Sequence, residues 1–397
     1  MNIKSSRRGG GTRLLFPLLF AGFAAYGVVL TIFGAALPRI ISDFRWSYTV
    51  TGLVLAASSV GFFLSTFASG LLLEGFRPKP LYAVSVCLSA AAISLFGRWP
   101  SPVLNLLFSF AVGLSQGVVE VVTNYETVRL EREGQSRKMN LLHAGFSVGA
   151  IAGPLAVGGL LSRSGSWQLV FPGAGALLLS IAVLTAFVQF PEPEKGLHQG
   201  MESGLKLLRE PVLVLLCLAM LFYVGSELGV SNWVAEYFVR VRGAPGSTAA
   251  LAVSALWIGL LAGRGFLWIA WHGKRQEIVL LALSLLSTAG LLAFLAVRGS
   301  VPAMGIVFAI GLGYSGIYPL IVSLAGTAFR STAAVGMAAT AAGIGSFSFP
   351  FLLAGIAQGL GLKAGFLLLG ILPLGIAVIS VVLTRILPRD SRQNRST

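Results

Sequence analysis

The fold is decided by residues 101–127, which read SPVLNLLFSFAVGLSQGVVEVVTNYET. A run of about 20 mostly apolar residues is long enough for a helix to cross the hydrocarbon core of a bilayer. Gln116, Glu120 and Asn124 recur at intervals of four within this run, so they share one face of the helix. An ionisable group inside a bilayer costs at least ~2.5–3.5 kcal/mol. We therefore expect Glu120 to line a polar cavity inside a bundle of membrane helices.

The composition is that of a polytopic membrane protein. Of the 397 residues, 55% are hydrophobic and 11% are charged, whereas a soluble domain usually carries about 25% charged residues. The net charge of +15 does not indicate nucleic-acid binding, because the Lys and Arg residues fall in short loops between apolar runs. Cys87 and Cys217 lie within apolar runs and predict no disulfide. The residues predict no metal site, no cofactor and no enzymatic activity.

Twelve membrane-spanning helices account for the apolar runs. The predicted ranges are 14–41, 48–73, 80–97, 102–127, 140–162, 167–190, 211–239, 247–271, 277–297, 301–328, 332–359 and 364–387. The longest connection, 191–210, begins with Pro-Glu-Pro-Glu-Lys, and this mixture of proline and charge is typical of a linker. The predicted fold is an all-α membrane protein with an N-terminal six-helix bundle over 1–190, a cytoplasmic linker over 191–210 and a C-terminal six-helix bundle over 211–397.

The distribution of positive charge predicts the orientation. Of the 29 Lys and Arg residues, 20 fall in segments on the same side of the membrane as the N-terminus and 8 fall on the other side. Only Arg264 lies within a span. Cytoplasmic loops carry the excess of Lys and Arg, so both termini are expected in the cytoplasm of a multi-pass cell-membrane protein.

The two halves of the chain repeat each other with an offset near 197 residues. The fifth and eleventh spans share one spacing, with Gly149, Pro154 and Gly159 matching Gly345, Pro350 and Gly355. Further matches pair Gly61 with Gly259, the run 111–114 with 309–312, and Tyr26-Gly27 with Tyr223 and Gly225. Small residues at such spacing let helices approach closely, although glycine is common here and some matches arise by chance. The repeat predicts two bundles related by a pseudo-two-fold axis, with a solute site between them.

The twelve spans, the central linker and the repeat resemble the major facilitator superfamily. The loop motif of that superfamily is represented after the second span by GLLLEGFRPK, in which Gly70, Glu74 and Arg77 remain. The resemblance implies that these three residues have structural or gating roles.

Within the superfamily the chain is similar to the fucose–proton symporter family, which includes glucose transporters. The strings that carry this likeness are EVVTN (120–124), NLLHA (140–144), YVGSE (223–227), NW (232–233), WIG (257–259), GR (263–264) and IYP (317–319). Glu120 matches an acid that takes part in proton-coupled sugar binding in that family. Gly34 stands where the family has a second acid, so the two-carboxylate arrangement is broken here.

Three residues are candidates for proton coupling. Glu120 is either a proton carrier or a neutral structural carboxyl group bonded to a neighbouring helix. Glu227, in the seventh span, either replaces the acid missing at Gly34 or makes a helix–helix hydrogen bond to Arg264. His143 suits a proton relay because its ordinary pKa is near 6.5, but a lone histidine near a helix end is also a common structural residue.

A sugar has apolar faces and a rim of hydroxyl groups, so its site requires amides, carboxyl groups and aromatic rings. The predicted solute-binding residues are Gln116, Glu120, Asn124, Asn140, Tyr223, Asn232, Trp233, Trp257, Tyr314 and Tyr318. For Asn140 the alternative is a helix cap. For the aromatic residues it is the interfacial belt, to which Trp99, Trp167 and Trp271 are assigned by position.

The remaining charged residues in the spans have structural readings. Glu126 is expected to pair with Arg129 or Arg330 as a gate or a loop-stabilising acid at the inner end of the fourth span. Arg264 is expected to latch onto a neighbouring helix. Glu236 lies nearer the outer surface and is expected to be solvated.

The sequence therefore predicts a secondary active transporter that works as a monomer in the lipid bilayer. It moves a small polar solute, expected to be a monosaccharide, by alternating access with H⁺ as the coupling ion and Na⁺ as the alternative. Export of lipophilic or drug-like compounds is the rival transport function. A solute sensor that does not transport is the rival from another class.

Overall fold

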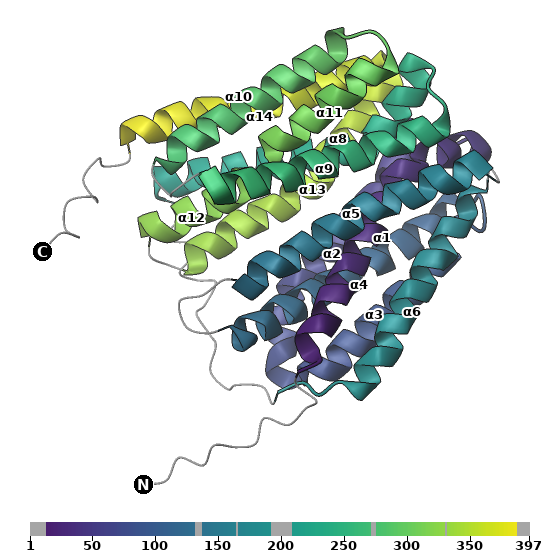
Figure 1. The fold of residues 1–397 in the computed structure, drawn as a ribbon. Helices are drawn as coiled ribbons and strands as arrows, with labels where there is room; N and C mark the ends of the chain where they lie inside the picture. The colour runs from purple at the N-terminus through teal and green to yellow at the C-terminus, as the bar shows by residue number, and fades with distance from the viewer. Residues whose placement is uncertain are drawn as a thin grey trace, which may run out of the picture. The chain divides into compact units, whose positions relative to one another are not determined.

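The computed structural model describes residues 13–131, 137–163, 166–191, 209–270, 275–329 and 332–386. Within these ranges twelve segments are helices long and apolar enough to cross a membrane, which confirms the predicted all-α membrane fold. The helices are α1 (Leu15–Phe44), α2 (Tyr48–Gly75), α3 (Pro78–Leu95), α4 (Pro102–Leu130), α5 (Arg137–Arg163), the 3-10 helix η2 (Trp167–Leu169), α6 (Val170–Phe187), α8 (Pro211–Arg242), α9 (Gly246–Ala270), α10 (Gln276–Ala296), α11 (Ser300–Tyr314), α12 (Ile317–Phe329), α13 (Thr332–Leu360) and α14 (Leu362–Ile386) (Figure 1).

Local sequence signals set the ends of these helices. Pro78, Pro102 and Pro211 each stand at the first turn of a helix, where the missing N–H removes no intrahelical bond. Gly243 ends α8 in the left-handed conformation with φ of 67°. The predicted span boundaries are therefore correct to within a few residues at these positions.

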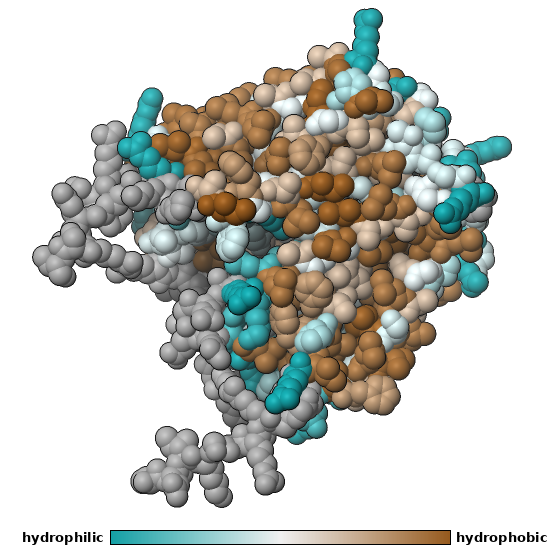
Figure 2. Space-filling view, in the orientation of Figure 1, coloured by the Kyte–Doolittle hydropathy of each residue, from teal (hydrophilic) through white to brown (hydrophobic). Residues whose placement is uncertain are grey.

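The outer surfaces of the helices are apolar, as a bilayer requires. Figure 2 shows hydrophobic residues over most of the visible face, with hydrophilic residues toward the helix ends. Phe187, Trp268 and Val301 are 76%, 81% and 86% exposed. Large apolar side chains left bare to this extent are expected where lipid covers the protein.

The tenth span is interrupted, although its sequence predicts one continuous helix. The span Ser300–Phe329 consists of α11 and α12, with a turn at Ser315 and Gly316. The cause is Pro319, which has no N–H to donate to the carbonyl of Ser315 four residues earlier. That freed carbonyl instead accepts a hydrogen bond from Arg264 Nε of α9, at 3.3 Å.

The contacts between residues divide the chain into two compact units. Unit 1 comprises Met1–Trp46, Leu53–Leu197 and Gly246–Ser254, and unit 2 comprises Ser47–Gly52, His198–Pro245 and Ala255–Thr397. The first turns of α2 thus belong to unit 2, and the first turns of α9 belong to unit 1. Residues 192–208 of the predicted linker lie outside the described residues.

Glycines at matching positions bring matching helix pairs together in each unit. In unit 1 a Cβ on Gly149 of α5 would lie 1.8 Å from the carbonyl oxygen of Ala24 in α1. In unit 2 a Cβ on Gly345 of α13 would lie 2.3 Å from the carbonyl oxygen of Leu221 in α8. Such contacts are possible only for glycine, so the sequence repeat reflects repeated close packing.

The same repeat contains glycines with no packing role. Nothing in the described residues lies within 4 Å of a Cβ added to Gly159 or Gly355. The regular spacing of the repeat therefore overstated how many of its glycines lie in a helix–helix contact.

One tryptophan and one glutamate are more deeply buried than the sequence predicts. Trp167 is fully buried, and its Nε1 donates to Asp43 Oδ2 at 2.6 Å, so its assignment to the interfacial belt is wrong. Glu236 is also fully buried rather than solvated. In both cases the partner comes from a distant part of the sequence, which hydropathy alone does not reveal. Trp99 is 45% exposed, as a belt residue would be, and Trp271 lies outside the described residues.

Candidate functional site

The centre of the candidate site in unit 1 is a carboxyl group paired with a phenol. Glu120 lies in the middle of α4 and is half-buried. The hydroxyl of Tyr26, on α1, donates a hydrogen bond to its carboxylate. Glu120 therefore faces another helix of the bundle, which satisfies the requirement that a carboxyl group within a membrane has a polar partner.

Three phenylalanine rings lie close to Tyr26, the partner of Glu120. The ring of Tyr26 lies 5.6 Å from that of Phe23, 6.3 Å from that of Phe62 and 5.3 Å from that of Phe146. Phe62 comes from α2 and Phe146 from α5, and both are half-buried. The carboxyl group thus adjoins a wall of rings, a combination that suits a solute with polar edges and an apolar face.

The other members of the α4 stripe carry unused hydrogen-bonding capacity. Gln116 is 5% exposed, and its Nε2 has no partner among the described residues. Asn124 is half-buried, and its Oδ1 also has no partner within the described part of the chain. Buried polar atoms without partners are costly, so they mark places where a water molecule or a solute group would be stabilised.

Unit 2 holds a second carboxyl group within a membrane helix, and this one is buried. Glu227 is 8% exposed in the middle of α8, and the hydroxyl of Tyr223, one turn earlier, donates a hydrogen bond to it. The positive charge of Arg264 on α9 is close enough to act on this carboxylate. The hydrogen bond between Glu227 and Arg264 that the sequence offers as an alternative stays a prediction.

Two further predicted residues gather around Tyr223. Tyr314, at the end of α11, is fully buried, and its hydroxyl shares a 2.5 Å hydrogen bond with Ser226 Oγ. The rings of Tyr314 and Tyr318 lie 6.0 and 6.3 Å from that of Tyr223. Tyr318 is 37% exposed, so among these three tyrosines it presents the most surface.

The tryptophans of unit 2 are held in its core. Trp257 of α9 is 3% exposed, and its Nε1 donates to Ser231 Oγ of α8 at 3.1 Å. Trp233 is fully buried, and its Nε1 has no partner among the described residues. Asn232, beside it, is half-buried.

The acid at the end of α4 has the partner that the sequence predicts. Glu126 is fully buried, and Arg129 Nη1 lies 3.1 Å from its Oε1. The same nitrogen donates to the carbonyl of Pro191 at 3.4 Å. Arg129 thus ties the end of α4 to the start of the linker, while Arg330 lies outside the described residues.

The remaining candidates lie apart from Glu120 or are described only in part. The ring of His143 is 5.4 Å from that of Phe23, which places this histidine at the edge of the aromatic wall. Asn140 is exposed in the first turn of α5. Arg77 is exposed directly before α3. Gly70 and Glu74 lie near the end of α2, but their side-chain surroundings fall outside the described part.

Sequence reasoning missed Tyr26 and Ser226. The signal for Tyr26 was present, because the repeat pairs it with Tyr223, which was a candidate. No sequence signal singled out Ser226. Its Oγ shares a hydrogen bond with the hydroxyl of Tyr314 and donates one to the carbonyl of Leu369, so it links these two residues.

The twelve membrane-length helices and the carboxyl groups within α4 and α8 are those of a membrane transporter. The chain belongs to the Major Facilitator Superfamily, whose family model matches residues 18–333.

Among its curated relatives, the Protein TsgA homolog of Serratia proteamaculans is 24% identical over 77% of this chain and 78% of its own length. Protein TsgA of Salmonella typhimurium is 25% identical over 77% of both chains. Similar solved structures include the nucleoside transporter NupG (TM-score 0.76, 14% identity, 95% of this chain and 100% of the other). A D-xylose–proton symporter is also similar (TM-score 0.72, 14% identity, 96% and 98%).

Proposed function

We propose that this transporter is a secondary active one that moves a small, neutral, hydroxyl-bearing solute, a monosaccharide in the first instance, by proton-coupled alternating access. The observation that carries the proposal is the Glu120–Tyr26 pair beside an aromatic wall in unit 1. A carboxyl group in a membrane helix can take up and release a proton. A phenol hydroxyl beside it can exchange its hydrogen bond for one with a solute.

The chemistry around Glu120 favours a neutral polar solute. Gln116 Nε2 and Asn124 Oδ1 offer one donor and one acceptor without partners within the described residues. Solute hydroxyl groups can use both, because a hydroxyl donates and accepts. The names of two similar proteins, a D-xylose–proton symporter and a nucleoside transporter, refer to solutes with several hydroxyl groups and support this class.

Binding by the purified protein tests the solute class. D-xylose, D-glucose, L-fucose and uridine are added to the full chain in detergent, and the midpoint of thermal unfolding is measured with and without Na⁺. A ligand at 100 times its Kd stabilises the folded state by about 2.7 kcal/mol, so at least one of the four is expected to raise the midpoint by several degrees. No shift with any of them, together with a shift caused by apolar cations such as tetraphenylphosphonium, would favour the exporter.

The exporter stays the second candidate because of the same aromatic wall. Phe62 and Phe146, which are half-buried, would also contact an apolar compound. The unpartnered Gln116 and Asn124 count against it, because an apolar ligand would cover them without supplying a hydrogen bond.

A prediction concerns Trp257, which either stacks on the solute or anchors α9 to α8. If Trp257 stacks on the solute, Trp257→Ala weakens solute binding by about tenfold, because aromatic contacts contribute ~0.5–1.5 kcal/mol beyond their buried area. Trp257→Phe retains the ring and is expected to bind almost normally. The control is Ser231→Ala, which removes only the acceptor of the Nε1 hydrogen bond. If Ser231→Ala and Trp257→Phe lower the unfolding midpoint as much as Trp257→Ala does, Trp257 is an anchor and not a binding residue.

A further inference from the structure

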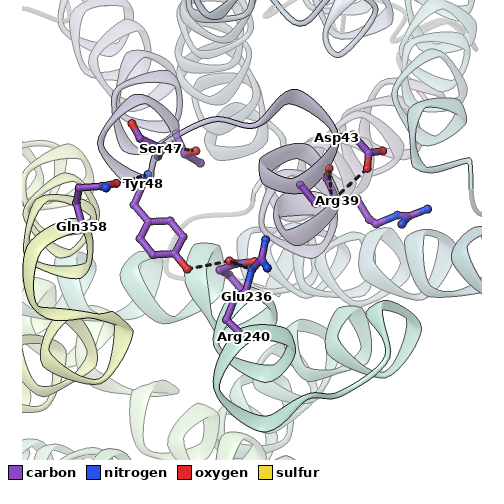
Figure 3. Close-up of polar contacts among 9 residues, drawn as sticks. Arg39, Asp43, Ser47, Tyr48, Glu236, Arg240 and Gln358 are labelled. Atoms are coloured by element: carbon purple, nitrogen blue, oxygen red, sulfur yellow. Dashed lines mark hydrogen bonds and ion pairs between the residues drawn. The ribbon is translucent and has the colours of Figure 1, made fainter.

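The first turns of α2 contact a polar cluster of unit 2, in which Glu236 is fully buried, Tyr48 is half-buried, and Arg240 and Gln358 are exposed. Tyr48 Oη donates to Glu236 Oε1 of α8 at 3.0 Å, and Arg240 Nε donates to the same oxygen at 3.0 Å. The backbone N–H of Tyr48 donates to Gln358 Oε1 of α13 at 2.8 Å. Figure 3 shows Tyr48 reaching down from the start of α2 to Glu236, with Arg240 beside the carboxylate and Gln358 at the backbone.

Packing reinforces these hydrogen bonds. The ring of Tyr48 meets that of Trp233 edge to face, with centroids 5.6 Å apart. A Cβ on Gly52 would lie 2.4 Å from the Cβ of Ala354 in α13, so this turn of α2 lies directly against α13. Residues 47–52 therefore contact two helices of unit 2, α8 and α13.

The assignment of these residues to unit 2 gives the cluster a mechanical role. Residues 47–52 belong to unit 2, and α2 continues from Leu53 as part of unit 1. A helix that belongs to both units couples their movements. Any rearrangement that carries all of α2 with unit 1 has to break the contacts of Tyr48 first.

One oxygen of the carboxylate in this cluster lacks a hydrogen bond, which lowers the cost of separating the cluster. Glu236 is fully buried, but its second oxygen, Oε2, has no hydrogen-bond partner among the described residues. A buried carboxylate oxygen without a partner is costly, and departure of the Tyr48 ring would let water reach it. Hydration of this oxygen would offset part of the lost Tyr48 bond.

The start of α9, which corresponds to the start of α2 in the sequence repeat, can be compared with it. The first turns of α9, residues 246–254, belong to unit 1, and Ser254 Oγ donates to the carbonyl of Ile151 in α5 at 3.0 Å. This contact is a neutral hydrogen bond, whereas the contact of Tyr48 is with a charged group. Hydrogen bonds to charged groups are the stronger ones.

We propose that Tyr48, Glu236 and Arg240 form a latch that retains the start of α2 on unit 2 and that opens as a step of the transport cycle. Tyr48 and Glu236 are positioning residues, because they act on α2 rather than on the solute. This role does not depend on the identity of the solute or on proton coupling.

A buried reporter on the latched turn tests the proposal. Thr51 of α2 is 1% exposed and belongs to unit 2, so a cysteine there is expected to react faster with a maleimide when the turn leaves unit 2. The experiment uses the full purified chain carrying Thr51→Cys, Cys87→Ser and Cys217→Ser, because Cys87 is exposed. Tyr48→Phe removes only the donor hydroxyl, and Glu236→Gln removes the charge of the acceptor. Each is expected to speed labelling about tenfold, as loss of a charge-assisted hydrogen bond implies.

Controls separate latch opening from general loosening. The double variant Tyr48→Phe/Glu236→Gln is expected to label no faster than the faster single variant, because both remove the same bond. Ser254→Ala is expected to stay within about twofold of the parent rate. A second reporter, Ser284→Cys, lies fully buried in α10 and is expected to label at an unchanged rate. Unchanged labelling of Thr51→Cys in Tyr48→Phe would overturn the latch. An equal increase in the labelling rate of Ser284→Cys would overturn it as well. If Glu236→Gln fails to fold, the labelling rate in Tyr48→Phe is sufficient to decide.

Discussion

Replacing Glu120 with Gln is expected to abolish solute accumulation driven by a proton gradient while exchange of solute for solute continues. The substitution keeps the size and polarity of the side chain, so Tyr26 still has an oxygen to bond. An amide, however, cannot take up and release a proton, so movement of the solute is no longer tied to that of H⁺. The measurement is uptake of a radiolabelled sugar identified by thermal shift, in proteoliposomes with an imposed pH difference. Initial uptake is expected to fall to the rate of protein-free liposomes.

The matched control is Glu210→Gln. Glu210 is an exposed acid directly before α8, and its side chain makes no capping hydrogen bond. This variant loses the same charge at the end of a membrane helix, and it is expected to accumulate solute at the parent rate. Accumulation that persists in Glu120→Gln would show that the coupling proton is carried elsewhere, with Glu227 the next candidate.

Substitution of Gly149 is expected to have a large effect on folding. A Cβ at this position would lie 1.8 Å from the backbone oxygen of Ala24, and backbone cannot move aside as a flexible side chain can. Gly149→Ala therefore forces α1 and α5 apart, at a cost of at least ~1–3 kcal/mol. We expect the thermal unfolding midpoint of the purified protein to fall by several degrees, with a lower yield of monodisperse protein.

Gly159→Ala is the control on the same helix. Nothing among the described residues lies within 4 Å of the added Cβ, and alanine favours a helix over glycine by ~0.8–1 kcal/mol. This variant is expected to unfold at the parent temperature or slightly above it. The same contrast is expected in unit 2 between Gly345→Ala and Gly355→Ala. Equal midpoints for Gly149→Ala and Gly159→Ala would mean that the close α1–α5 contact contributes little.

Much of the fold could be predicted because hydropathy, proline and glycine act locally. The limits of α4 and α8 follow from Pro102, Pro211 and Gly243, which act within one helical turn. The break in the tenth span was missed, although Pro319 was visible in the sequence. Prolines within helices are often tolerated in membranes, and here the outcome depends on Arg264 stabilising the freed carbonyl of Ser315.

The candidate site was predictable only in part, because its partners come from other helices. The i, i+4 spacing identified the stripe of Gln116, Glu120 and Asn124. It could not reveal that Tyr26, from α1, bonds Glu120. Glu236 was misread for the same reason, since Tyr48 comes from a helix nearly 190 residues away in sequence. Burial of an acid depends on long-range packing, whereas helix length depends on local composition.

Proton movement coupled to solute movement is the most direct test of the proposed function. Purified protein is reconstituted with a pH-sensitive dye inside the liposomes, and the sugar identified by thermal shift is added outside without an imposed pH difference. The parent protein is expected to acidify the lumen as the sugar enters, and Glu120→Gln is expected to produce no pH change. Sugar entry without acidification by the parent protein, or equal acidification by Glu120→Gln, would contradict proton coupling through Glu120.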